Sequence, residues 1–245
     1  MTPFAQYFDD VAVINLKSRP DRRQSILHEL KSIGFSPDRV RIPDAPICED
    51  DGGFPSRGVY GNYLSHIQLL RGALERSAKR VLILEDDAIF SRKARSVEYQ
   101  ARVLAEAEKF DWATWHLGHK LRRQLRFEEE VVLPCEEEFH WAHCYAVQKE
   151  SIASLLNFLE LIMTLPPEDP RAGKMYIDGA LYHYRAEATD KPCLISNPAL
   201  SIQKGSDSNL AGPVNPGFVS LARRPRQIAR YLRDEFWRWS DIDFR

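Results

Sequence analysis

Short runs of apolar residues alternate along the chain with amphipathic stretches of helical length. The runs expected to form buried strands are 11–16, 39–42, 81–84, 112–118 and 143–148. Apolar residues that recur at helical spacing predict helices over 18–35, 60–78, 96–110 and 149–162. Strands that alternate with helices predict an α/β fold, in which a Rossmann-type, mostly parallel central sheet is flanked by helices.

The first predicted helix carries clear start and stop signals. Ser18 is a candidate N-cap, Pro20 suits the first helical turn and Gly34 suits the end. Residues 43–58 are rich in Pro, Gly and Asp, which predicts a long loop. In the helix after that loop, four apolar residues are expected to share one face: Tyr63, Ile67, Leu70 and Leu74.

Composition narrows the class of protein without identifying it. The 245 residues are 44% hydrophobic, and 34 basic residues nearly balance 35 acidic ones. This predicts one large globular domain, over 1–218, without the basic excess that would favour nucleic acid as a partner. The four cysteines form no CxxC pair and are expected to be reduced, structural thiols. The first residues show no signal peptide, which favours a cytoplasmic protein.

Three acidic residues follow directly on one of the apolar runs. Glu85, Asp86 and Asp87 come at the end of the strand predicted over 81–84, where ligands of open α/β sheets bind. In an extended chain the side chains of Glu85 and Asp87 point to one side and that of Asp86 to the other. Because adjacent carboxylates repel, this cluster suits a hard cation such as Mn²⁺ or Mg²⁺. Structural ion pairs would explain it equally well.

Four segments, in this order, resemble glycosyltransferase family 25, which includes lipopolysaccharide-core glycosyltransferases and collagen galactosyltransferases. They are VINLKSRPDRR (13–23), GNYLSHIQLLRGA (61–73), VLILEDDAIF (81–90) and HCYAVQKESIASLL (143–156). The resemblance implies a GT-A-like fold and inverting transfer from a nucleotide-sugar, usually a UDP-sugar, with Mn²⁺ as the usual metal. The expected reaction moves a hexose, such as galactose, to a lipopolysaccharide- or lipooligosaccharide-type glycan acceptor.

The resemblance also gives roles to the acids and to the segment after the first strand. Asp87 would bind the metal, and Glu85 or Asp86 would support it or contact the ribose. Asn15, Arg19 and Arg22 would line the nucleotide site, where the planar guanidinium group suits phosphate. The alternative is a solvated helix start whose arginines pair with acids nearby.

Two further segments supply candidates. By resemblance, Ser65 and His66 lie at the donor site, although a lone histidine is also common in packing positions. Inversion needs a general base that takes the proton of the acceptor hydroxyl. The resemblance suggests Asp178 for this role, and the alternative is an N-cap for a helix over 179–185.

The region that should supply a further metal ligand departs from the family pattern. A histidine is usual there, but PALSIQKGSDSNL (198–210) contains none. Gln203 and Lys204 are the candidates for binding the donor there, and His183 is the nearest alternative metal ligand. The departure keeps open a non-catalytic protein that binds nucleotide-sugars, and a metal-dependent phosphatase or nucleotidyltransferase is the other alternative.

The C-terminal segment, 219–245, combines arginines with aromatic residues. Six arginines fall within 222–238. The same range contains the aromatic residues Tyr231, Phe236 and Trp237. A helix of this composition suits an anionic membrane surface, which predicts peripheral contact with the inner face of the cell membrane. The alternative is a terminal helix that packs its aromatic residues on the domain.

Overall fold

The computed structural model describes residues 1–121, 130–137, 139–166, 169 and 175–204. The arginine-rich segment 219–245 and the expected domain boundary at 218 lie outside these residues. Within them, none of the helices has the length and hydrophobicity that crossing a bilayer requires.

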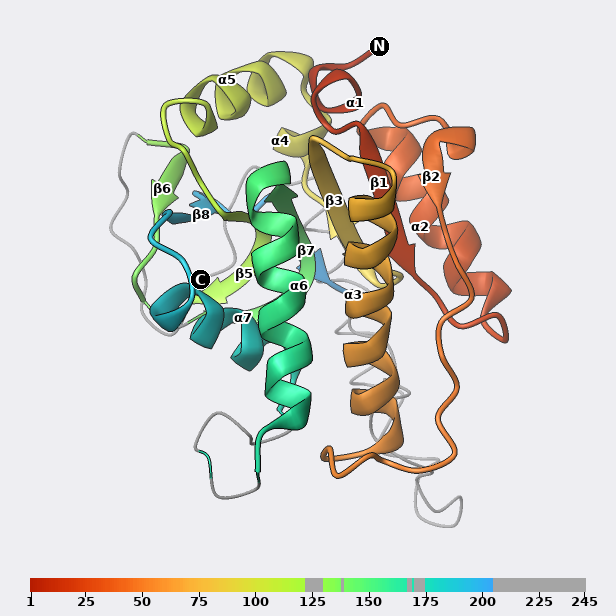
Figure 1. Ribbon diagram of the computed structural model, residues 1–245. Helices are drawn as coiled ribbons and strands as arrows, with labels where there is room; N and C mark the ends of the chain where they lie inside the picture. Colours follow the sequence, from red (N-terminus) through yellow and green to blue (C-terminus); the bar gives the residue numbers. More distant parts are fainter. Residues whose placement is uncertain (122–129, 138, 167–168, 170–174, 205–245) are drawn as a thin grey trace, which may run out of the picture.

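Nine strands and seven α-helices make up the described part of the chain (Figure 1). The strands are β1 (Asp10–Ile14), β2 (Val40–Arg41), β3 (Arg80–Glu85), β4 (Ala88–Phe90), β5 (Thr114–Leu121), β6 (Val132–Pro134), β7 (Phe139–Gln148), β8 (Cys193–Ser196) and β9 (Ser201–Gln203). The helices are α1 (Pro3–Tyr7), α2 (Pro20–Ser32), α3 (Arg57–Glu75), α4 (Arg92–Arg95), α5 (Val97–Ala107), α6 (Lys149–Thr164) and α7 (Ile177–Glu187), with one 3₁₀ turn at Pro37–Arg39.

All nine strands join one sheet, whose main path runs β2-β1-β3-β7-β5-β8-β6, with β4 and β9 attached beside β5. The pairings give β1, β2, β3, β5, β8 and β9 one common direction and give β4, β6 and β7 the opposite one. The predicted α/β class with a mostly parallel central sheet is therefore confirmed. The antiparallel β7 lies between β3 and β5, so its first residues reach the edge of the sheet where β3 ends.

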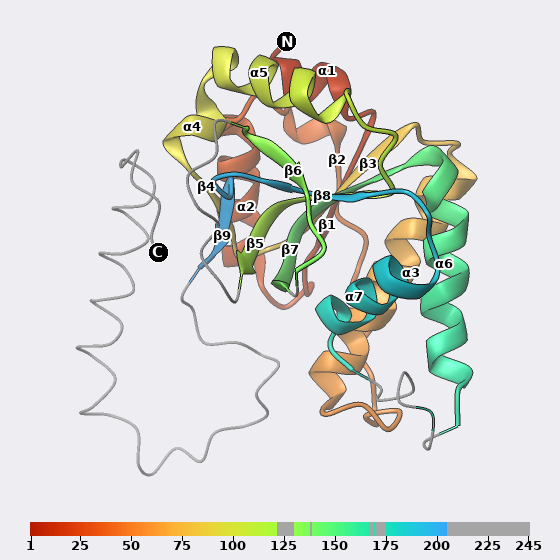
Figure 2. The same ribbon diagram turned by 90° about the vertical axis from the view of Figure 1, so that its left-hand side faces the viewer.

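Helices cover both faces of the sheet, as the two views show (Figures 1 and 2). The apolar side chains of α1, α2 and α5 pack on one face, and those of α3, α6 and α7 pack on the other. Neighbouring residues of β3 divide between these cores: Leu82 and Leu84 belong to the first, and Val81 and Ile83 to the second. This alternation is what a strand that is buried on both faces requires.

The structure corrects two predictions about helix ends. Arg19, and not Ser18, is the N-cap residue of α2, whereas Pro20 and Gly34 lie where their chemistry predicts. Helix α3 begins at Arg57, three residues before the predicted start, because the Ser56 hydroxyl accepts a hydrogen bond from the amide of Val59 at 3.2 Å.

One prediction about the buried face of α3 is wrong, and the prediction about the cysteines is confirmed. Leu74 is 45% exposed and does not share the buried face of α3, where Ala73 takes the expected place. The cysteines are free thiols, as predicted, and three of the four are buried.

A charged cluster ties the start of the parallel sheet together. Asp10 begins β1, and its carboxylate accepts two hydrogen bonds from Arg41 on β2, at 2.7 and 2.8 Å. Arg76, at the end of α3, donates a third at 2.9 Å. Burial acts to raise the pKa of Asp10, but the hydrogen bonds and charges of the two arginines outweigh it and lower that pKa.

Replacing Asp10 with Asn should destabilise the fold by about 2 kcal/mol at pH 7, because two arginines lose their partner. Their partial exposure keeps the loss below that of a fully buried pair. A carboxylate with a lowered pKa stabilises above its unfolded pKa of about 4, so the difference from wild type should shrink as the pH falls below that value. Urea unfolding at several pH values measures this, and Glu106→Gln, in a surface pair with Lys109, is the control.

Candidate active site

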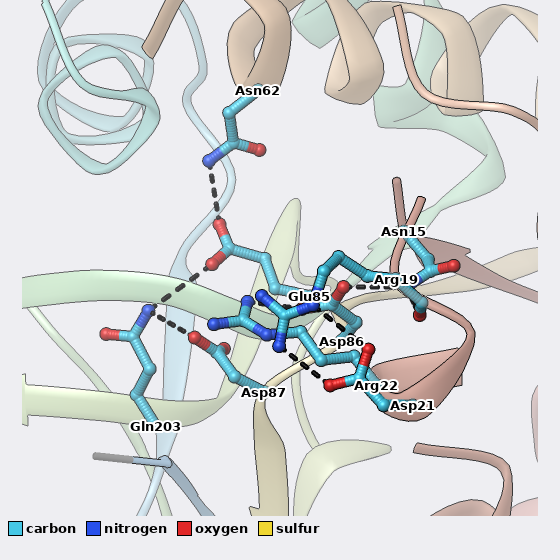
Figure 3. A network of polar contacts seen from close by, with 9 residues as sticks. All are labelled: Asn15, Arg19, Asp21, Arg22, Asn62, Glu85, Asp86, Asp87 and Gln203. Carbon is cyan, nitrogen blue, oxygen red and sulfur yellow. Dashed lines mark hydrogen bonds and ion pairs between the residues drawn. The ribbon is translucent and has the colours of Figure 1, made fainter. Parts of the chain in front are cut away.

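The three acids lie at a tight turn between β3 and β4, and they separate as the alternation predicts (Figure 3). Glu85 and Asp87 both face Gln203, at the end of β9. Asp86 points away from them, toward residues of the β1–α2 segment. One strand end therefore provides a converging pair of carboxylates and a third that is used elsewhere.

Asp86 is held by two partners on its own side. Asn15 donates to one carboxylate oxygen at 2.7 Å, and Arg22 donates to the other at 3.0 Å. The Asn15 amide also donates to the carbonyl of Arg19 at 3.2 Å, which fixes the start of α2 beside the strand end. The negative charge of Asp86 is therefore compensated within the described structure.

Glu85 is held mainly from helix α3. Asn62 donates to its Oε1 at 3.0 Å, and Nε2 of His66 lies 3.7 Å from the same oxygen. The amide of Gln203 approaches the other oxygen, Oε2, at 3.4 Å. Burial acts to raise the pKa of Glu85, but His66 and Asn62 outweigh this effect, so its pKa lies below the usual value and the group is ionised.

Of the three acids, Asp87 is the one whose negative charge is compensated least by its neighbours. Gln203 donates to its Oδ2 at 3.2 Å, and Oδ1 is buried with no hydrogen-bond partner among the described residues. Burial and then the charges of Glu85 and Asp86 raise the pKa of Asp87 to about 8. A carboxylate in this state would gain from a cation, because a positive charge removes the repulsion that burial strengthens.

These acids form the floor of a cavity of about 330 Å³. Its polar lining residues are Asn15, Arg22, Asn62, Glu85, Asp86, Asp87 and Gln203. Apolar lining comes from Leu16 and from residues 45–48 of the long loop. The first turn of α3, with Arg57 and Gly58, borders the same space.

A divalent cation fits this donor set only with help from a ligand. No group of three or more His, Cys, Asp or Glu side chains in the described residues is arranged to hold a metal ion. Glu85 and Asp87 supply two carboxylates, and hard cations such as Mg²⁺ are commonly held by one or two carboxylates together with substrate phosphates. The unpartnered Oδ1 of Asp87 is the observation that favours a cation here.

The remaining candidates from the donor segments have different environments. Ser65 borders the cavity, and its hydroxyl donates to the carbonyl of Gly61 at 2.7 Å. His66 is fully buried beneath Glu85. Arg19 makes a two-bond pair with Asp21, at 3.0 and 2.8 Å, and is not among the residues that line the cavity. For Arg19 the structure matches the alternative interpretation, a pair at the helix start.

Lys204 and His183 do not bring their side chains to the acids. The Lys204 side chain is exposed, and its backbone amide donates to the carbonyl of Asp87 at 2.7 Å. His183 lies in the middle of α7 and pairs with Glu187 at 2.9 Å, one helical turn away. Lys204 therefore fixes the backbone of the acidic turn.

Asp178 lies at the same edge of the sheet, outside the cavity lining. It is in the first turn of α7, whose N-cap residue is Tyr176, so the alternative interpretation as an N-cap is wrong. Its carboxylate accepts a hydrogen bond at 3.2 Å from the amide of Trp141, which has a positive φ of 74°. Trp141 is near the start of β7, the end of that strand that meets the end of β3.

Sequence reasoning missed Asn62 and Arg57. Asn62 precedes Ser65 and His66 by three and four residues, so on a helix it shares their face. That spacing was a usable signal. Arg57 was assigned to the loop, because the predicted helix began at Tyr60.

Comparisons with known proteins find a family model and relatives that resemble parts of this chain. Residues 54–169 match the model of glycosyltransferase family 25, described as an LPS biosynthesis protein. Inactive glycosyltransferase 25 family member 3 of Homo sapiens is 28% identical over 66% of this chain, and procollagen galactosyltransferase 1-A of Xenopus laevis is 28% identical over 68% of it. The chain spans about a third of the length of these relatives, 31% in both cases.

Among solved structures, a glycosyltransferase involved in the glycosylation of the major capsid of PBCV-1 aligns with a TM-score of 0.47 and 11% identity. The alignment covers 93% of this chain and 98% of that one. The match to the family model includes helix α3, strand β3 and the three acids of the cavity floor. Residues 54–169, a little under half of the chain, are therefore similar to glycosyltransferase family 25.

Proposed function

We propose that this chain is a metal-assisted glycosyltransferase that takes a hexose from a UDP-sugar. The observation that carries the proposal is the converging pair of Glu85 and Asp87, with a buried, unpartnered oxygen on Asp87, at the floor of a cavity. Mn²⁺ or Mg²⁺ on these carboxylates would bind the diphosphate of the donor. A bound cation of this kind neutralises the charge that develops on the leaving diphosphate.

The lining of the cavity offers both kinds of contact that a nucleotide needs. The apolar lining residues, among them Leu16, Pro46 and Ile47, suit the flat face of a base. Arg57 and the first turn of α3 border the cavity, and the free amide groups of a helix N-terminus favour phosphate. Asn15 and Arg22 hold Asp86 in place, beside the carboxylates that would carry the cation.

The proposed reaction is a direct displacement with inversion. The oxygen of an acceptor hydroxyl attacks the anomeric carbon, the bond from that carbon to the β-phosphate oxygen breaks, and UDP leaves with the bonding electrons. A general base takes the proton of the hydroxyl. Asp178 is our candidate for the base, since it lies at the same sheet edge and its side chain is 23% exposed.

The acceptor is proposed to be a glycan or glycolipid of the lipopolysaccharide type. The description of the matching family, an LPS biosynthesis protein, supports this choice. The relatives named procollagen galactosyltransferase support a hexose, and galactose in particular, as the sugar that is moved. The basic segment 219–245 would then hold the protein to the inner face of the membrane; it lies outside the described residues.

A second candidate function is nucleotide-sugar binding without transfer. Two observations favour it: the segment that was expected to supply a histidine brings Gln203 to the acids instead, and several of the matching relatives are named inactive. Incubation with UDP-sugars and Mn²⁺ separates the candidates, since many transferases hydrolyse their donor slowly without acceptor. Release of UDP supports the transferase, binding without release supports the second candidate, and release of phosphate from simple phosphomonoesters would indicate a phosphatase instead.

Replacing Asp87 with Asn should abolish Mn²⁺-dependent UDP release while keeping the fold. Without a cation, the substitution removes a buried negative charge, so the melting temperature should be equal to or above that of the wild type near pH 8.5. Donor hydrolysis and differential scanning fluorimetry measure the two effects. Full activity of this variant with saturating Mn²⁺ would contradict the metal assignment.

Cation binding should release a proton near neutral pH. With a pKa of about 8, Asp87 is mostly protonated at pH 6.5 and mostly ionised at pH 8.5, and a cation binds the ionised form. Mn²⁺ affinity should therefore rise over this interval, with close to one proton released at the lower pH. Calorimetry in buffers of different ionisation enthalpy counts the protons, and a pH-independent affinity would oppose this assignment.

Replacing Asp178 with Asn should abolish transfer to the acceptor and leave the binding of UDP and Mn²⁺ within about twofold of the wild type. The amide keeps the hydrogen bond from Trp141 but cannot take a proton at neutral pH. Glu187→Gln, at the other end of α7, is the control for helix α7 itself. Unchanged transfer by the Asn variant would remove Asp178 from the mechanism.

A further inference from the structure

A group of buried polar rings lies beneath the cavity, in a core that is otherwise apolar. Tyr145 of β7 lies between the imidazole rings of His66, on α3, and His116, on β5. Each ring centroid is 5.6 Å from that of Tyr145, with interplanar angles of 24° and 18°. All three side chains are almost completely buried, with at most 1% exposed. We call this group the ring stack.

The ring stack reaches the cavity through a single carboxylate. The hydroxyl of Tyr145 is 2.9 Å from Nδ1 of His66, and Nε2 of the same imidazole is 3.7 Å from Oε1 of Glu85. The second distance is too long for a direct hydrogen bond, and a movement of roughly 0.7 Å would make one. Tyr145 is therefore two contacts away from a carboxylate of the cavity floor.

The contacts favour one direction of hydrogen bonding. A carboxylate only accepts, so Nε2 of His66 carries a proton where it faces Glu85. The hydroxyl of Tyr145 can then donate to Nδ1 on the other side of the ring. Burial also raises the pKa of Tyr145 and keeps the hydroxyl protonated. The tyrosine thereby selects the histidine tautomer, a role that outer hydrogen bonds commonly have at metal sites.

The arrangement leaves one oxygen of Glu85 for the cavity. Asn62 and His66 both approach Oε1 from helix α3, whereas Oε2 faces Gln203. The stability of the core does not require this network, since apolar side chains of similar shape could replace the polar ones at little or no cost in stability. Its direction toward Glu85 points to a role in the site.

We propose that Tyr145 is a positioning residue, which acts through His66 to aim Oε2 of Glu85 at the cation and the donor diphosphate. The inference rests on the proposed function, because it assigns the residue a task in the same site. Loss of the hydroxyl leaves Nδ1 without its donor and the imidazole free to turn, so the carboxylate loses its fixed direction. Weaker cation binding, with little change in folding, is the expected signature.

Tyr145→Phe tests the proposal, because it removes only the hydroxyl and keeps the stacked ring. We expect the Kd for Mn²⁺ in the presence of UDP, measured from the EPR signal of free Mn²⁺, to rise about tenfold. Tyr63→Phe is a matched control: its buried hydroxyl donates to the carbonyl of Leu159 at 3.0 Å, in the same core and without contact to the acids. That variant should show a similar drop in melting temperature and an unchanged Kd.

A second pair of variants covers the case in which Tyr145→Phe does not fold. His66→Gln keeps an amide donor that can reach Glu85, and His66→Leu has none. The proposal expects the Gln variant to bind Mn²⁺ more tightly than the Leu variant. Equal Kd values for that pair, or for Tyr145→Phe and Tyr63→Phe, would overturn it. A wild-type chain that binds neither Mn²⁺ nor UDP would instead overturn the proposed function itself, and this inference with it.

Discussion

Three consecutive carboxylates at a buried strand end are the constraint on which the rest of the site depends. Their mutual repulsion would be costly unless each charge were compensated separately. The chain does this from three different segments: the β1–α2 segment holds Asp86, α3 holds Glu85, and β9 supplies Gln203 to Asp87. Only the last compensation is incomplete, because Gln203 is neutral and the charge of Arg22 does not outweigh the burial of Asp87 and the charges of the two neighbouring acids. The chemistry that we propose uses this remaining demand for positive charge.

The sequence predicted the parts of this arrangement that depend on local pattern. The apolar run of β3 and the period of two in a strand were enough to place Glu85 and Asp87 on one side and Asp86 on the other. This prediction succeeded because it needs only the neighbours in the chain. Ser65 and His66 were expected at the donor site from the family resemblance, and the structure places Ser65 at the border of the cavity and His66 beneath Glu85.

The parts that the sequence could not predict depend on contacts between distant residues. Glu85 and Gln203 are 118 positions apart, and β9 is only three residues long, too short to be recognised by periodicity. The antiparallel direction of β7 has no local signal, yet it brings Trp141 and its partner Asp178 to the site edge. The pairing of Arg19 with Asp21 was the alternative to a role in nucleotide binding. It could be foreseen because the two residues are neighbours at the start of one helix.

Gln203 has the chemistry to serve both the pair of carboxylates and the cation that we propose. Its Nε2 donates to both Glu85 and Asp87, a position between two carboxylates where a cation would otherwise be favourable. A cation at that point would repel the amide hydrogens, and a half-turn of the amide would exchange them for its oxygen. Amide oxygens are ligands for hard cations. The same side chain can therefore stabilise the two carboxylates through its amide hydrogens and would be able to hold a cation through its oxygen, which a histidine with a single lone pair could not do without changing its tautomer.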